Sequence, residues 1–244
     1  MGALCPHFFF TLNYYSHDMR LLFAQHLDPS LRKGYESVFN RDLKEEIITM
    51  TRVSIKSALK FYPDIHLYCD KDSEKHYKDL PITLHELKTT PDFFCGAKLE
   101  VLEDQKDCDF IWIDPDIFIS TTLNIKDDVR FMYEKSTTLN DYYYNQLSYF
   151  SEKHPEYPMV REWLNAGLLW FKDREVLDYH INLYKELMTK TSDARIVETW
   201  NLSHCATKFT NNEFRMTTEY LHFEGYKKFF GITRDMIKQL DLYL

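Results

Sequence analysis

The chain has 244 residues, and 30 Lys and Arg against 38 Asp and Glu give it a formal net charge of −8. This acidic balance argues against a dedicated nucleic-acid-binding protein, because no excess of basic side chains is available to neutralise phosphates. With 44% hydrophobic and 16% aromatic residues, the chain is too apolar for a disordered protein and long enough to bury a large core. We therefore expect a globular protein without a nucleic-acid partner.

The hydrophobic runs and the cysteines indicate the cellular compartment in which the protein is expected. No apolar run approaches the roughly 20 residues that span a bilayer, so we expect no transmembrane segment. The 5 cysteines are an odd number, without a C-x-x-C pair. Buried free thiols in a reducing compartment explain this pattern better than a disulfide framework or a zinc site. A cytoplasmic location is therefore expected.

In the first half of the chain, short hydrophobic runs alternate with segments of helical periodicity. A buried-strand pattern at 8–13 is followed by an irregular, charged stretch at 14–45. Apolar residues then recur at helical spacing from 44 to 61, and Pro63 ends that helix. Further along, the pattern predicts a charged helical segment at 71–79, a helix at 98–104, and strands at 65–69, 82–87, 110–113 and 117–119.

The second half continues the alternation of strands and helices. Strands are expected at 129–133, 164–171 and 218–223, a partly helical segment at 136–162, and helices at 175–188, 197–208 and 234–244. This order predicts an α/β fold in which helices cover both faces of a sheet. No change in composition marks a second domain, so we expect a single domain over 1–244.

Two aspartates, Asp114 and Asp116, directly follow the hydrophobic strand at 110–113. In open α/β sheets, ligands bind beyond the carboxyl ends of strands. The spacing of two, with Pro115 between, predicts that both carboxylates lie on one side of an extended segment. Such a pair favours Mg²⁺ or Mn²⁺, with phosphate oxygens completing the shell, and hence a nucleoside-diphosphate substrate. The alternative is a solvated acidic turn, since Asp-Pro-Asp also suits turns.

Six segments in a fixed order carry a resemblance to a known family. They are FTLN at 10–13, SIKSALKFYPDIHLYCD at 54–70, KLEVL at 98–102, FIWIDPDIFI at 110–119, LNAGLLWF at 164–171 and HFEGYKK at 222–228. Together they resemble the GT-A glycosyltransferases, most nearly glycosyltransferase family 8, the glycogenin/galactosyltransferase-like family. The resemblance implies one Rossmann-like GT-A domain with a mixed central sheet flanked by helices. Its nucleotide-binding half would be 8–119, and its acceptor- and sugar-binding half 120–244.

The resemblance also implies a metal site and a phosphate clamp. Asp116 and His222 would ligate Mn²⁺ or Mg²⁺, and Asp114 would contact the metal or the ribose. Gly225 would let the backbone approach a phosphate, and Lys228 would clamp the leaving diphosphate. An ordinary strand histidine and a basic turn are the structural alternatives, and the neighbouring Lys227 is another candidate for the clamp.

Further donor contacts follow from the same resemblance. They are Thr11, Asn13 and Tyr15 to the base or ribose, Lys98 to the phosphate or sugar, and Asn165, Ala166 and Gly167 along the sugar pocket. Strand ends, a surface lysine and a β-bulge are the corresponding structural alternatives. The family's Asp-Gln pair is not evident, and Glu198 stands in its place. It would stabilise an oxocarbenium-like transition state or act as the nucleophile, unless it merely complements a helix dipole.

The reaction implied by the resemblance is metal-dependent transfer of a sugar from a UDP-sugar to an acceptor hydroxyl. The resemblance favours retained configuration, and the departure from the family pattern around Glu198 keeps inversion open. The acceptor would be a glycan, a protein or a small molecule. A nucleotidyltransferase is disfavoured, because FFFTLNYYSH lacks a Gly-rich, basic phosphate loop. A haloacid-dehalogenase-type phosphatase is also disfavoured, because its D-x-D usually follows the first strand. A non-catalytic carbohydrate-binding module with the same fold is the alternative from a different functional class.

Overall fold

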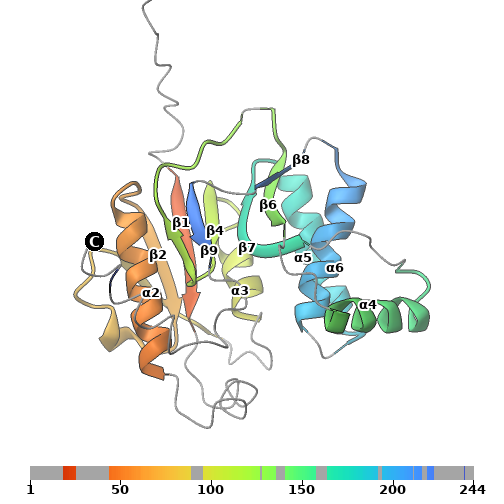
Figure 1. Ribbon diagram of the computed structural model, residues 1–244, viewed down its shortest axis with the longest axis horizontal. Helices are drawn as coiled ribbons and strands as arrows, with labels where there is room; N and C mark the ends of the chain where they lie inside the picture. Colours follow the sequence, from red (N-terminus) through yellow and green to blue (C-terminus); the bar gives the residue numbers. More distant parts are fainter. Residues whose placement is uncertain are drawn as a thin grey trace, which may run out of the picture.

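A mixed β-sheet forms the centre of the protein, and helices cover both of its faces (Figure 1). The computed structural model describes residues 19–25, 44–88, 96–126, 128–135, 141–157, 164–191, 194–210, 212–215, 219–222 and 239. The strand order in the 7-stranded sheet is β3-β2-β1-β4-β7-β6-β8. Strand β7 runs antiparallel to both neighbours, and the other neighbouring pairs are parallel. The predicted α/β fold class with a mixed sheet is confirmed.

The strands of the central sheet are β1 (Arg20–Gln25), β2 (Ile65–Cys69), β3 (Thr83–Glu86), β4 (Phe110–Ile113), β6 (Phe131–Lys135), β7 (Leu164–Phe171) and β8 (Asn212–Arg215). A separate two-stranded sheet pairs β5 (Ile117–Ile119) with β9 (Tyr220–His222). The helices are α2 (Lys44–Leu59), α3 (Gly96–Asp104), α4 (Asp141–Lys153), α5 (Arg174–Met188) and α6 (Ala194–Lys208), with a short 3₁₀ turn at Glu74–His76.

Two hydrophobic cores lie on opposite faces of the sheet. On one face, alternate strand residues such as Leu21 and Phe23 pack with Ile55 of α2 and with the β5–β9 pair. On the other face, Leu22 belongs to a core shared with α3, α5 and α6. Because both faces of the central strands are covered, these strands are continuously hydrophobic instead of alternating with polar residues. Helix α4 packs against α5 and α6 as an outer layer (Figure 1).

The first described strand corrects one prediction. The stretch 14–45 was expected to be irregular, but β1 lies within it and pairs in parallel with both β2 and β4. The strand has only six residues, RLLFAQ, and a polar side chain at each end. It forms a strand because it is buried between two neighbouring strands. The predicted strand at 8–13 lies outside the described residues, as does the terminal helix at 234–244 apart from residue 239.

Smaller differences concern the edges of the sheet. Strand β8 was not predicted, since it is a short edge strand beside β6. Only Glu74–His76 of the charged segment at 71–79 is helical, as a 3₁₀ turn.

Within the described ranges, no helix is both long enough and apolar enough to cross a membrane.

Candidate functional site

Three strands bring polar residues together at one edge of the central sheet. Because β7 is antiparallel to β4 and β6, its amino end lies beside their carboxyl ends. The Asp114 backbone N–H, just after β4, donates to the Gly167 carbonyl oxygen at 2.7 Å. Glu134, near the end of β6, is in register with Asn165 of β7. The sheet therefore places two carboxylates and the predicted sugar-pocket strand side by side.

The segment that contains the aspartates is a tight turn. The Ile117 backbone N–H donates to the Asp114 carbonyl oxygen at 3.0 Å, which closes a reverse turn through Pro115 and Asp116. The prediction that both carboxylates lie on one side of an extended segment is therefore wrong. The alternation of side chains holds only for extended backbone, and the two carboxylates contact different partners.

Asp114 contacts side chains of β4 and α3. Its Oδ1 accepts a hydrogen bond from Trp112 Nε1 at 2.9 Å and lies 3.2 Å from Lys98 Nζ. Lys98 Nζ also donates to the Ala166 carbonyl oxygen at 2.8 Å and lies 2.5 Å from Glu198 Oε1. The buried ammonium thus joins two carboxylates and the backbone of β7, and it lies 5.0 Å from the centre of the Trp112 ring. Lys98 is a bridging cation inside the site, not a surface lysine.

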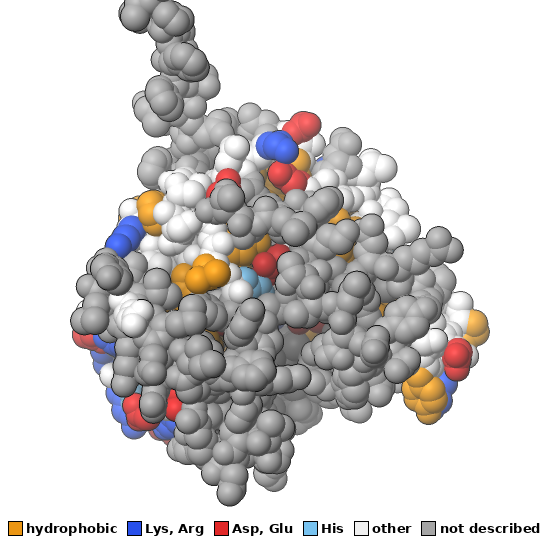
Figure 2. Space-filling model, viewed as in Figure 1, with side chains coloured by type: hydrophobic (Ala, Val, Ile, Leu, Met, Phe, Trp, Pro, Cys, Tyr) orange, Lys and Arg blue, Asp and Glu red, His pale blue; other side chains and the backbone are white. Residues whose placement is uncertain are grey.

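Asp116 contacts His222, the last residue of β9. His222 Nε2 lies 3.5 Å from Asp116 Oδ1, and His222 Nδ1 lies 2.6 Å from Glu134 Oε2. Strand β9 sets this position, because His222 is in register with Ile117 of β5, the residue after Asp116. On the face drawn in Figure 2, histidine, acidic and hydrophobic side chains adjoin near the centre of the molecule.

The charge of His222 follows from its surroundings. Burial alone would lower its pKa, but the negative charges of Asp116 and Glu134 outweigh burial and raise the pKa to about 10. In this structure the imidazole is therefore the cationic partner of two buried carboxylates.

Gly167 allows His222 to approach β7. A Cβ atom built on Gly167 would lie 2.8 Å from His222 Cε1, and 3.2 Å from both Asn165 Oδ1 and Glu134 Oε2. Any side chain at this position would collide with the imidazole. The small residue of the Asn-Ala-Gly strand thus makes room for the histidine, in addition to the sugar-pocket role that the resemblance implies.

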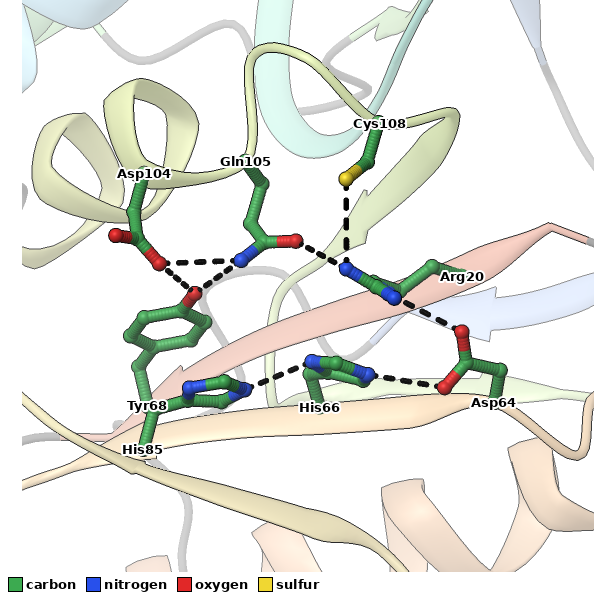
Figure 3. A network of polar contacts seen from close by, with 8 residues as sticks. All are labelled: Arg20, Asp64, His66, Tyr68, His85, Asp104, Gln105 and Cys108. Atoms are coloured by element: carbon green, nitrogen blue, oxygen red, sulfur yellow. Dashed lines mark hydrogen bonds and ion pairs between the residues drawn. The ribbon is translucent and has the colours of Figure 1, made fainter.

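The far end of α3 is fixed to the sheet by a polar network (Figure 3). Arg20 of β1 donates from Nη1 to Gln105 Oε1 at 2.6 Å and from Nε to Asp64 Oδ2 at 3.1 Å. Gln105 in turn donates from Nε2 to the Tyr68 hydroxyl at 2.6 Å. The remaining members are His66, His85, Asp104 and Cys108. Because Lys98 lies in the first turn of the same helix, the network helps to fix the position of its ammonium.

The predicted site residues fall into three groups. Two clusters are assembled: Lys98, Asp114, Ala166 and Glu198 around the ammonium, and Asp116, Gly167 and His222 around the imidazole. Asn165 adjoins the second cluster, because its Oδ1 accepts from the Gly167 backbone N–H at 2.7 Å. The others lie outside the described residues: Thr11, Asn13, Tyr15, Gly225, Lys228 and its alternative Lys227.

Two residues of the site were missed from the sequence. Glu134 lies at the end of β6, beyond the predicted strand at 129–133. Trp112 lies in the predicted hydrophobic strand at 110–113, and its indole N–H also donates to Asp114 Oδ1. A strand prediction extended by two residues would have placed Glu134 at the same sheet edge as the aspartates.

Asp116 and His222 suit a hard divalent cation. Asp114, Asp116 and His222 together do not form a three-ligand site in the described part of the chain. Among these residues, no group of three or more His, Cys, Asp or Glu side chains is arranged to hold a metal ion. Asp116 Oδ1 and His222 Nε2 nevertheless face one another at 3.5 Å, and a mixed oxygen and nitrogen donor pair suits Mn²⁺. Asp114 Oδ1 instead contacts Trp112 and Lys98.

No protein-family model and no curated protein matches the sequence. Among solved structures, the chain is similar to the galactosyltransferase LgtC in complex with donor and acceptor sugar analogues, with 12% identity, a TM-score of 0.49, and coverage of 85% of this chain and 87% of LgtC. It is also similar to the glycosyltransferase GlyE of Streptococcus pneumoniae TIGR4, with 11% identity and a TM-score of 0.43 over 81% of this chain and 46% of GlyE, so it spans less than half of that protein. A third similar structure is the CTP:phosphocholine cytidylyltransferase LicC of Streptococcus pneumoniae, with 11% identity and a TM-score of 0.47 over 89% of this chain and 98% of LicC.

Proposed function

We propose that the protein is a metal-dependent glycosyltransferase of the GT-A type that transfers a sugar from a UDP-sugar to an acceptor hydroxyl. The observation that carries this proposal is the 3.5 Å separation of Asp116 Oδ1 and His222 Nε2. These residues are far apart in the sequence, and the sequence resemblance implies that both contribute to one cation site. The choice of uridine and the retained configuration follow from the sequence resemblance.

Asp116 and His222 are the residues that would hold Mn²⁺ or Mg²⁺ in this proposal. A cation bound there would neutralise the negative charge that develops on the leaving diphosphate. Donor phosphate oxygens would complete its shell, since Mg²⁺ and similar ions often bind few protein ligands. Asp114 contributes mainly through Lys98, because its Oδ1 contacts that ammonium. Lys228 and Gly225 keep their proposed role as the diphosphate clamp.

Glu198 is our candidate for the carboxylate near the anomeric carbon. Lys98 fixes it at 2.5 Å and at the same time binds the Ala166 carbonyl oxygen of β7. A carboxylate held beside the sugar-pocket strand can stabilise positive charge on the sugar ring as the glycosidic bond breaks. Asn165 offers a side-chain amide for sugar hydroxyls.

The test is Mn²⁺-dependent hydrolysis of a panel of nucleotide-sugars, measured as release of the nucleoside diphosphate. We expect UDP-sugars to be hydrolysed and Asp116→Asn to lower the rate by about 100-fold or more, the scale of losing a key electrostatic contact. Asp109→Asn is the matched control at the other end of β4, because Asp109 is exposed and pairs only with Arg174 among the partners described, at 3.2 Å.

Three results would contradict the proposal. Equal hydrolysis by wild type and Asp116→Asn would remove Asp116 from the reaction. Release of pyrophosphate from a nucleoside triphosphate and a sugar phosphate, without hydrolysis of any nucleotide-sugar, would identify a nucleotidyltransferase instead. Binding of Mn²⁺ and UDP without turnover of any donor or acceptor would indicate the non-catalytic module.

A further inference from the structure

We propose that Glu134 is a positioning residue that holds the imidazole of His222 so that Nε2 faces Asp116 and is available to a divalent cation. This inference rests on the proposed function, because it assigns a role to a third residue of the same site. Glu134 belongs to none of the motifs that carry the sequence resemblance, and its role is inferred from its contacts alone.

The two ring nitrogens of His222 have separate partners. Nδ1 lies 2.6 Å from Glu134 Oε2, and Nε2 lies 3.5 Å from Asp116 Oδ1. A cation that binds at Nε2 would replace the proton that the cationic imidazole carries on that nitrogen, while Nδ1–H still donates to Glu134. The lone pair then lies on Nε2, which is the nitrogen that faces Asp116. A carboxylate behind a metal-binding histidine fixes both its tautomer and its ring orientation.

Burial makes the orientation specific. The side chains of His222 and Glu134 are 8% and 10% exposed, so bulk water has little access to replace either partner. The register of β6 against β7 shifts between Tyr133 and Glu134, and an irregularity of this kind redirects the side chain that follows it. On the remaining side, Gly167 leaves space for the ring where a Cβ atom would lie 2.8 Å from His222 Cε1.

Two other roles for Glu134 make different predictions. If Glu134 itself were a cation ligand, its negative charge would be essential, and Gln would be nearly as harmful as Ala. If it only stabilised the fold, its replacement would lower stability without a selective effect on the cation. A positioning role requires only an acceptor for Nδ1–H, and the Gln amide oxygen can supply one.

The experiment measures the Mn²⁺ dissociation constant of the full chain with saturating UDP, by the electron paramagnetic resonance signal of free Mn²⁺. The variants are Glu134→Ala and Glu134→Gln. The matched control is Glu213→Gln, a carboxylate on the neighbouring strand β8 that pairs with Lys126 at 3.1 Å. Thermal unfolding and the affinity for UDP without metal are measured for every variant, so that a general loss of structure is recognised.

We expect Glu134→Ala to weaken Mn²⁺ binding by about 10- to 100-fold, the range for partners of metal-binding histidines. Glu134→Gln should recover most of that affinity, and Glu213→Gln should bind like wild type. Unchanged binding by Glu134→Ala, or equal loss in Ala and Gln, would overturn the positioning role. So would a loss of Mn²⁺ binding matched by an equal loss of metal-free UDP binding.

Hydrolysis of UDP-sugars by the wild-type protein is measured in parallel and separates the two proposals. If wild type binds Mn²⁺ and hydrolyses the donor but the order of the variants fails, only the inference about Glu134 is overturned. If wild type binds no Mn²⁺ with UDP, both are overturned.

Discussion

The ammonium of Lys98 lies 2.5 Å from Oε1 of Glu198, which joins the first turn of α3 to α6. Both side chains are largely buried, and the same ammonium lies 3.2 Å from Asp114 Oδ1. One cation therefore balances two carboxylates at the edge of the sheet. Buried carboxylates repel one another when no cation lies between them, so this arrangement links the stability of the fold to the geometry of the site.

Replacement of Lys98 by Met should destabilise the protein and inactivate it. The change keeps a long apolar stem but leaves Asp114 and Glu198 without the ammonium. Removing one partner of a buried ion pair typically lowers the free energy of unfolding by about 3 kcal/mol or more. Urea unfolding of the variant measures this loss, and Glu198→Gln added to Lys98→Met should restore part of it.

The control for this prediction is Lys185→Met, because Lys185 pairs with Glu103 at a site where both side chains are 40% exposed or more. An exposed pair contributes about 0–1 kcal/mol. If Lys98→Met were no more destabilising than Lys185→Met, Lys98 would not balance the two carboxylates in the way its contacts indicate.

Replacement of Gly167 by Ala should displace His222. The new methyl carbon would lie 2.8 Å from His222 Cε1, and such overpacking typically lowers the free energy of unfolding by about 1–3 kcal/mol. We expect weaker Mn²⁺ binding together with this loss of stability. Chemical denaturation and Mn²⁺ titration measure the two effects.

A second substitution distinguishes the collision from other effects of the methyl group. Adding His222→Ala to Gly167→Ala removes the ring that the methyl group meets. This double variant should regain stability relative to Gly167→Ala but should not regain Mn²⁺ binding. If it remains as unstable as the single variant, the contact with His222 is not the cause.

Much of the central sheet was predictable because its strands are continuous hydrophobic runs. The strands at 65–69, 110–113 and 164–171 were predicted with the bounds they have, since burial on both faces leaves an unmistakable pattern. Strand β1 was missed, because its four apolar residues between Arg20 and Gln25 carry a weaker signal than the phenylalanines at 8–10. The identity of a central strand was therefore decided by tertiary pairing, which local pattern does not encode.

Part of the candidate site was likewise predictable from the sequence, and part was not. The family resemblance implied Asp116 and His222 as partners at one cation site and Lys98 and Glu198 as site residues, and the structure brings the members of each pair together. The direction of Asp114 was predicted wrongly, since a turn replaces the extended backbone. Glu134 was missed because its contact with His222 joins strands of two different sheets.

A buried histidine should make the stability of the protein depend on pH. His180 of α5 is fully buried, and burial, reinforced by the positive charge of Lys98, lowers its pKa to about 3. Its Nε2 has no hydrogen-bond partner within the described part of the chain. The unfolded chain binds a proton at this residue below about pH 6.5, whereas the folded chain binds one only near pH 3. The stabilising contribution of neutral His180 is therefore complete above pH 6.5 and decreases as the pH falls toward 3.

The variant His180→Leu should reduce this dependence. At pH 5 the unfolded chain is favoured by about 2 kcal/mol through His180 alone, at about 1.36 kcal/mol for each pH unit below 6.5. The loss of unfolding free energy between pH 7.5 and pH 5 should therefore be about 2 kcal/mol smaller in the variant.

Some pH dependence of the unfolding free energy remains in His180→Leu, because burial also lowers the pKa values of His66, His85 and His204. His154→Leu, at a partly exposed position, is the matched control for the change from His to Leu. An unchanged loss of unfolding free energy in His180→Leu would mean that His180 already binds a proton in the folded protein at pH 5, and that its surroundings are more polar than its contacts indicate.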